Sequence, residues 1–173
     1  FSTRLKLNRE VIGAWAEILQ KVPKSRLLIK YIAIDTATNQ ALLTRLFAEK
    51  GIDQSRLELE GWSPHPELLT SYNRVDIALD PFPYSGGFTT FEALWMGVPV
   101  ITVPGQTFAS RHAFSHLSTV GLTEFVGSDT DNYVKMAVEL ANDTQRLIDL
   151  RATLRDQMSQ SPACDTETFT RDF

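Results

Sequence analysis

The stretch from Asp76 to Pro104 constrains the fold of this chain more than any other. With Val75 it divides, in order, into a strand, a loop, a helix and a strand, over Val75–Leu79, Asp80–Gly87, Thr89–Met96 and Val98–Val103. The first and last segments are short apolar runs of the kind that form buried strands. The loop contains two prolines and a Gly-Gly pair, which exclude regular structure there. Gly97 is a suitable C-terminal stop for the helix.

A glycine-rich turn between a strand and a helix suits a phosphate ligand. Glycines let the backbone come close to a ligand, and the helix start offers unpaired N–H groups and the positive end of a dipole. Thr89 and Thr90 add hydroxyl donors, and Glu92, one turn further along, could hold a ribose diol. Two other interpretations stay open, because Thr89 and Glu92 also have the spacing of a capping box, and Gly86-Gly87 could form only a tight turn.

Length and charge limit the class of protein. The chain has 173 residues, which predicts one domain over residues 1–173. A net charge of −4 gives no support for binding to nucleic acid or to an anionic membrane. Cys164 is the single cysteine, so no internal disulfide is possible, and this fits a reducing, cytoplasmic compartment. No apolar run is long enough to span a bilayer. Phe1 is not an initiator residue, so we expect a piece of a longer protein.

Strands alternate with helices along the rest of the chain. We expect further strands at Arg26–Ile34, Leu57–Glu60 and Phe125–Val126, and helices after Asn8 and at Thr36–Lys50, Pro64–Tyr72, Ser110–Val120, Thr130–Asn142 and Thr144–Gln160. This order predicts an α/β fold, a Rossmann-like parallel sheet with helices on both faces. Ligands of such sheets bind beyond the carboxyl ends of the strands, where the Asp80–Gly87 loop lies.

The central motif resembles a known family. The segment DIALDPFPYSGGFTTFEALWMGVPVITVPGQTFASR is similar to the O-GlcNAc transferase and SPINDLY-like family of nucleotide-sugar glycosyltransferases, and the resemblance extends to both ends of the chain. It implies the C-terminal, donor-binding lobe of a GT-B glycosyltransferase. The family's tetratricopeptide repeats and N-terminal catalytic lobe are not in this sequence, and the family's first donor-lobe strand would end near Phe1.

The resemblance also assigns roles to individual residues. Lys6 matches a lysine that binds the donor diphosphate, the loop at Ser63, Pro64 and His65 faces the base, and Glu92 holds the ribose. The phosphate-binding turn corresponds to Gly86, Gly87, Phe88, Thr89 and Thr90.

The sequence departs from the family at several of these positions. Ser85 stands where asparagine or alanine is frequent, and Gly87 and Phe88 replace polar side chains. Leu68 replaces a histidine at the start of a short helix. These departures put the identity of the sugar in question.

Two other patterns suggest metal sites. Asp129-Thr130-Asp131 spells D-x-D, but its place before a helix favours an N-cap role over a metal-nucleotide site. His112 and His116 stand one helical turn apart without an evident third ligand. We therefore expect no metal cofactor.

The resemblance implies that this chain is the donor-binding lobe of a protein O-glycosyltransferase, which transfers a sugar to Ser or Thr hydroxyls. UDP-GlcNAc is the first candidate for the donor. The protein or peptide acceptor would bind to the absent repeats and N-terminal lobe, and the isolated lobe would be inactive. The nucleobase of the donor is not fixed by the sequence, because SPINDLY-like relatives use GDP-fucose. The alternatives are a non-catalytic interaction module attached to repeats and another GT-B sugar-nucleotide enzyme.

Overall fold

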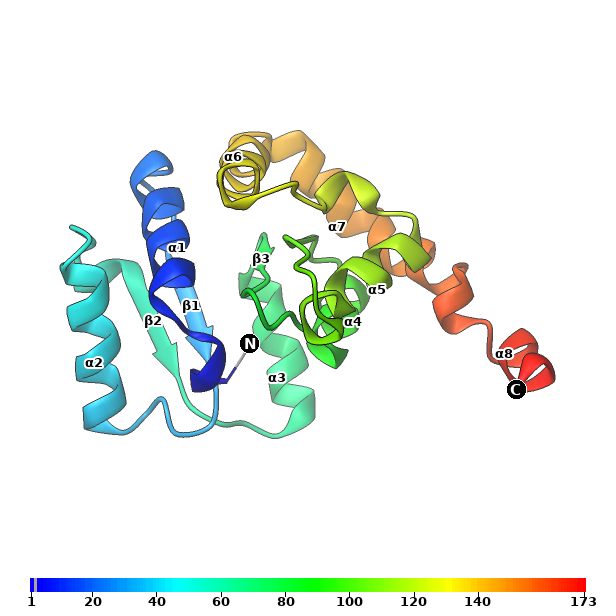
Figure 1. The fold of residues 1–173 in the computed structure, drawn as a ribbon, viewed down its shortest axis with the longest axis horizontal. Coiled ribbons are helices and arrows are strands. Elements are labelled where there is room, and N and C mark those ends of the chain that lie inside the picture. Colours follow the sequence, from blue (N-terminus) through cyan, green and yellow to red (C-terminus); the bar gives the residue numbers. More distant parts are fainter. Residues whose placement is uncertain (2) are drawn as a thin grey trace.

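A computed structural model describes residue 1 and residues 3–173, and it shows strands alternating with helices (Figure 1). The elements are α1 Arg9–Lys21, β1 Leu27–Lys30, α2 Ala37–Ala48, β2 Leu57–Glu60, α3 His65–Ser71, β3 Ala78–Leu79, α4 Phe88–Trp95, β4 Val100–Ile101, α5 His112–Val120, α6 Thr130–Ala141, α7 Thr144–Ser159 and α8 Thr166–Asp172.

The strands form two parallel pairs, which confirms the predicted parallel α/β class. β1 pairs with β2, in a register that places Leu27 beside Leu57, and β3 pairs with β4, with Ala78 beside Val100. A single parallel bridge between Thr102 and Val126 extends the second pair. No pairing joins β1 to β3 in the part of the chain that the structure describes, so the predicted continuous sheet is divided in two.

Several predicted strands are shorter in the structure. β2 has the predicted bounds, but Arg26–Ile34 forms a strand only over Leu27–Lys30, and Val75–Leu79 only over Ala78–Leu79. Beyond Lys30 the N–H of Ile34 donates to the Tyr31 carbonyl, which turns the chain. These strands end where their partners end, because a strand needs a neighbour to pair with.

Helix ends follow the local sequence. The Asn8 side chain accepts a hydrogen bond from the Val11 N–H at 2.9 Å and so caps α1, as predicted. Gly97, two residues after the end of α4, and Gly121, directly after α5, take the left-handed conformation, with φ of 73° and 78°. A residue with a Cβ is strained in that conformation, which is why glycine stands at both stops.

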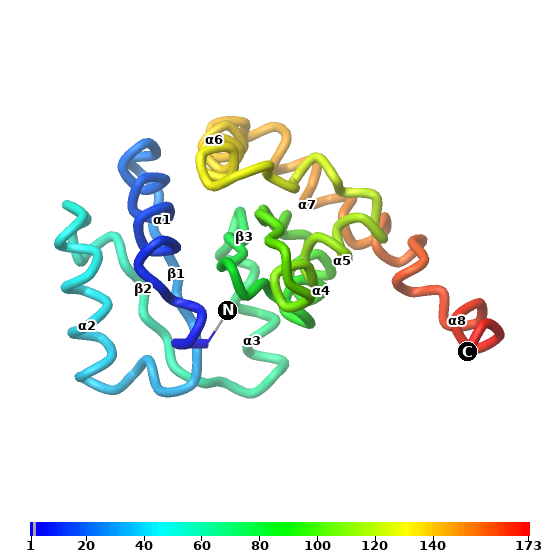
Figure 2. Tube along the Cα trace, viewed as in Figure 1, coloured from blue at the N-terminus to red at the C-terminus, as the bar shows by residue number. Residues whose placement is uncertain are grey.

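The core lies between the strand pairs and the helices. α1 packs on α6, and α4 packs on α7. Of the three tryptophans, Trp15 is buried in this core, whereas Trp62 and Trp95 are 68% and 39% exposed. Figure 2 shows the chain end at α8, away from the strands, while the N-terminus lies between β1 and β3.

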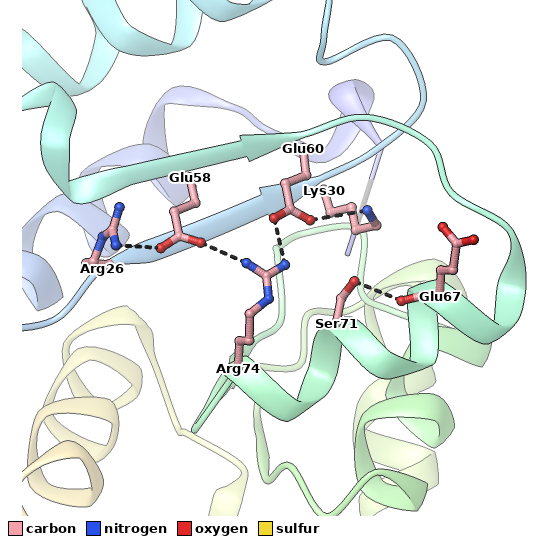
Figure 3. A network of polar contacts seen from close by, with 7 residues as sticks. All are labelled: Arg26, Lys30, Glu58, Glu60, Glu67, Ser71 and Arg74. Carbon is pink, nitrogen blue, oxygen red and sulfur yellow. Dashed lines mark hydrogen bonds and ion pairs between the residues drawn. The ribbon is translucent and has the colours of Figure 1, made fainter.

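Charged side chains connect the β1–β2 pair to the segment just before β3 (Figure 3). Arg74, just before β3, reaches back to β2 and contacts Glu58 at 3.1 Å and Glu60 at 2.6 Å. Arg26, just before β1, contacts Glu58, and Lys30 of β1 contacts Glu60. The arginine side chains are half-exposed, and each of their ion pairs contributes at most about 1 kcal/mol, so these pairs set geometry more than stability.

Candidate functional site

The start of α4 is open, as a phosphate-binding turn requires. The helix begins at Phe88 with Gly87 as N-cap, and no side chain caps it. The capping-box interpretation of Thr89 and Glu92 is therefore wrong, since Thr89 lies inside the helix. In the described chain the N–H groups of Gly87, Phe88 and Thr89 have no hydrogen-bond partner. They remain available to an acceptor from outside.

A buried carboxylate holds the turn in shape. Asp80 Oδ1 accepts the Gly86 N–H at 2.5 Å, and Asp80 Oδ2 accepts the Thr102 hydroxyl at 2.6 Å. The Thr90 hydroxyl donates to the Gly86 carbonyl from the other side, at 3.2 Å. A Cβ on Gly86 would lie 2.9 Å from both Asp80 Oδ1 and Thr90 Oγ1, so only glycine fits. Burial raises the pKa of Asp80 to about 6, although its hydrogen bonds and nearby Lys6 oppose the shift.

Ser85 connects the turn to α5. Its hydroxyl accepts the N–H groups of His112 and Ala113, at 3.0 and 3.3 Å, and donates to the Ala109 carbonyl at 3.2 Å. The Ser85 side chain therefore satisfies the first N–H groups of α5 and is not free for a ligand. This departure from the family sequence has a structural role.

Lys6 reaches the same turn from the other end of the chain. Its Nζ donates to the Ser85 carbonyl at 2.8 Å and lies 4.3 Å from the centre of the Tyr84 ring. Asn8 fixes the approach, because its Nδ2 donates to the Phe82 carbonyl at 2.6 Å. Burial lowers the pKa of Lys6, and the carboxylate of Asp80 partly offsets that effect.

The start of α3 meets α4 through an imidazole and a carboxylate. His65 Nε2 lies 2.9 Å from Glu92 Oε1, and Glu92 is buried whereas His65 is exposed. Ser63 Oγ is buried without a hydrogen-bond partner in the described structure, which is costly unless a ligand supplies one. The structure thus brings His65 against Glu92 of α4, and Ser63 lies two residues before His65.

The predicted residues do not all face one cavity. Lys6, Gly86, Thr89 and Thr90 line a cavity of about 530 Å³, whereas Ser63, His65, Gly87, Phe88 and Glu92 lie outside its lining. Phe88 is 72% exposed, and the Thr90 hydroxyl is engaged by Gly86. The site is therefore a surface around the α4 tip whose inner edge opens into the cavity.

Sequence reasoning missed Asp80 and Tyr84. Asp80 left a signal, because an acid directly after a buried strand and before a glycine turn is placed to accept a turn N–H. The contact of Tyr84 with Lys6 links residues far apart in the chain and has no local signal.

The other candidate sites have structural partners. Asp129 caps α6 through the Asn132 N–H at 2.8 Å, as predicted. His116 packs against Phe91, and His112 against Phe108. Within the described residues, no three His, Cys, Asp or Glu side chains are grouped so that they could hold a metal ion.

Parallel strands, covering helices and an open helix start at the strand ends define a Rossmann-like α/β lobe. Comparison with known proteins then gives the family. The model of glycosyl transferase family 41 matches residues 1–173, and the chain belongs to that family.

Named relatives extend the comparison. The chain is 37% identical to a probable UDP-N-acetylglucosamine–peptide N-acetylglucosaminyltransferase SPINDLY of Solanum lycopersicum, over all of this chain and 19% of that protein. It is 28% identical to the UDP-N-acetylglucosamine–peptide N-acetylglucosaminyltransferase of Caenorhabditis elegans, over all of this chain and 15% of that protein. The solved structure of a Thermobaculum terrenum O-GlcNAc transferase mutant superposes with a TM-score of 0.90 at 36% identity, and the match covers 98% of this chain and 34% of that one.

These matches confirm the predicted C-terminal GT-B lobe fold. The chain spans about a fifth of the length of its curated plant relatives. Among the described helices, none combines the length and the apolar character that a membrane span requires.

Proposed function

We propose that this chain is the donor-binding lobe of a protein O-glycosyltransferase that transfers GlcNAc from UDP-GlcNAc to Ser or Thr hydroxyls. The printed names of its relatives support the reaction class. The observation that carries the proposal is the position of Lys6, which is held at the glycine turn in front of the unpaired N–H groups of α4.

In this proposal the diphosphate of the donor binds at the α4 tip. The N–H groups of Gly87, Phe88 and Thr89 donate to its oxygens, and the Lys6 ammonium exchanges the Ser85 carbonyl for a phosphate oxygen. As the bond from the sugar to the phosphate breaks, negative charge grows on the departing diphosphate. These fixed donors stabilise that charge, so the proposed reaction uses no metal cofactor.

The nucleoside would extend from the tip toward the loop before α3. Glu92 accepts hydrogen bonds from the ribose hydroxyls, and the loop at Ser63 and His65 faces the base, where the unpartnered Ser63 hydroxyl gains a partner. Because His65 already contacts one oxygen of Glu92, it orients that carboxylate for the ribose.

The remaining parts of the enzyme lie outside this chain. We propose that a second lobe supplies any general base and that repeats bind the protein acceptor. We also propose a cytoplasmic location, for which Cys164 as the single cysteine is the support.

Calorimetry with UDP and GDP tests donor binding. We expect UDP to bind more tightly than GDP, and Lys6→Met to weaken binding by about tenfold or more, the effect of one charge-assisted hydrogen bond. Lys135→Met, which changes an exposed lysine on α6, is the matched control and should leave affinity unchanged. Equal affinity of the Lys6→Met variant would overturn the assigned role, and tighter binding of GDP would reassign the base.

A second candidate function rests on exposed aromatic side chains. Phe88 and Phe108 are 72% and 86% exposed, which suits a non-catalytic interaction module. Absence of binding by either nucleotide, in this chain and in the longer protein, would favour that function. Transfer catalysed by this chain alone would refute the proposal that the lobe is inactive without its partner.

A further inference from the structure

The N-cap position of α4 has no side chain, and an imidazole borders the space that one would fill. A Cβ on Gly87 would lie 4.0 Å from Nδ1 of His112, the first residue of α5. Apart from the chain neighbours of Gly87, no other atom of the described chain lies within 4 Å of that point. N-cap side chains usually accept a hydrogen bond from the helix start, so glycine leaves this tip open beside His112.

The backbone of His112 is bonded to the same glycine turn. Its N–H donates at 3.0 Å to the hydroxyl of Ser85, which lies two residues before Gly87. The Ser85 N–H and hydroxyl in turn donate to the Ala109 carbonyl, at 3.0 and 3.2 Å. The Phe108 ring packs edge to face on the imidazole, with ring centres 4.6 Å apart. These contacts hold the imidazole beside the tip, so less side-chain entropy is lost when a ligand binds to it.

The ring nitrogens of His112 are free to take a ligand. The residue is partly buried, and among the residues that the structure describes neither ring nitrogen has a hydrogen-bond partner. An imidazole carries at least one N–H donor in each of its protonation states. His65 differs, because its Nε2 already lies 2.9 Å from a carboxylate oxygen of Glu92. His112 therefore brings an unused donor to the tip of α4.

The unpaired N–H of Gly87 and the imidazole of His112 lie within range of one phosphate group. Because the Cβ of a residue lies about 2.5 Å from its own nitrogen, Gly87 N and His112 Nδ1 are at most about 6.5 Å apart. Two donors that each lie about 2.9 Å from one oxygen can be about 5.8 Å apart, and donors to different oxygens of one phosphate can be further apart. Both donors can therefore bind the same phosphate.

We propose that His112 is a further binding residue for the nucleoside diphosphate, and that its imidazole N–H donates to a phosphate oxygen beside the N–H of Gly87. This inference rests on the proposed function, because it takes the tip of α4 as the phosphate site. Ser85 then positions two donors, since its carbonyl accepts from Lys6 and its hydroxyl accepts the N–H of His112. A side chain of α5 thus supplies the donor that residue 87 does not carry.

Calorimetry tests this role, on the complete polypeptide that the gene encodes and with whichever of UDP and GDP the wild type binds more tightly. His112→Phe keeps a ring against Phe108 and removes the donor, so we expect affinity to fall by about tenfold or more. His112→Asn places an amide N–H near the position of Nδ1 and should keep affinity within about threefold of the wild type. His116→Phe, one turn further along α5 where the ring packs on Phe91, is the matched control and should leave affinity unchanged.

A rescue experiment separates phosphate binding from a structural role of the imidazole. Gly87→Ser places a hydroxyl donor in the space that His112 borders, and His112→Ala clears the ring from it. We expect the double variant to bind the nucleotide at least about threefold more tightly than His112→Ala alone. If the imidazole served only to pack the start of α5, a hydroxyl on α4 would restore nothing.

The possible results distinguish this inference from the proposed function. If Lys6→Met weakens binding and His112→Phe does not, the role of His112 is overturned and the proposed function stands. An equal loss in His112→Phe and His112→Asn, or no gain from Gly87→Ser, would show that the imidazole is structural and would likewise overturn its role. If the wild type binds neither UDP nor GDP, the proposed function fails and the role of His112 fails with it.

Discussion

Asp80 is the residue whose replacement gives the clearest test of how the phosphate turn is held. It is 5% exposed, and its two oxygens hold Gly86 and Thr102. Burial raises its pKa from 3.8 to about 6. The native state then binds a proton more tightly than the unfolded chain, so stability is highest below the unfolded pKa and falls as pH rises through the folded one.

The size of the effect follows from the shift. A difference of about two units between native and unfolded pKa corresponds to about 3 kcal/mol of unfolding free energy, lost between about pH 4 and pH 7. Asp80→Asn cannot titrate. In acid we expect the variant to be about 1–2 kcal/mol less stable than the wild type. As the pH rises to 7, the wild type loses about 3 kcal/mol and the variant does not, so the variant becomes as stable as the wild type or more stable.

Urea unfolding followed by tryptophan fluorescence, at several pH values, measures this difference. Asp76→Asn changes an exposed acid just before β3 and is the matched control, with a stability change within about 0.5 kcal/mol. A wild-type-minus-variant difference that stays constant from acid to neutral pH would refute a buried, titrating carboxylate at the turn.

Three further substitutions test the packing around the site by the same unfolding assay. Gly86→Ala should lower the free energy of unfolding by about 1–3 kcal/mol, because its Cβ would clash at 2.9 Å. Gly13→Ala, in open space within α1, is the control and should raise it by about 0.5–1 kcal/mol. Equal effects of the two substitutions would contradict the steric argument. Tyr133→Phe should cost about 1–3 kcal/mol, because it leaves the buried Trp15 Nε1–H without its acceptor at 2.9 Å, and a neutral result would contradict this. Arg151→Met should cost about 2–4 kcal/mol, because this guanidinium donates to three backbone carbonyls before and after β3; a loss under 1 kcal/mol would show that water replaces it.

The fold was largely predictable because its signals are local. Asn8 precedes an apolar pattern at helical spacing, and glycines stand where α4 and α5 stop, so these elements were placed within a residue or two. β3 was predicted too long, because strand length depends on a partner elsewhere in the chain. α8 was not predicted, since Thr166–Asp172 has no apolar stripe and is set by the Asp165 cap.

The candidate site was predictable in its parts and not in its connections. The glycine turn has a clear sequence pattern, and the resemblance to the family assigned Lys6 and Glu92. The bond from Lys6 to Ser85 joins positions 79 residues apart, and the His65–Glu92 contact depends on how α3 meets α4. Neither local propensity nor hydrophobic periodicity carries such long-range information.

The resting partner of Lys6 has a consequence for selectivity. Its ammonium is held at 2.8 Å by the neutral Ser85 carbonyl, so any incoming anion must outcompete an acceptor that is already in place. A carbonyl loses this competition most decisively to a ligand with several formal charges, because the Coulomb attraction between the ammonium and the ligand grows with the charge of the ligand. The site would thereby discriminate between a diphosphate and the more abundant singly charged anions of the cell, without any side chain dedicated to excluding them.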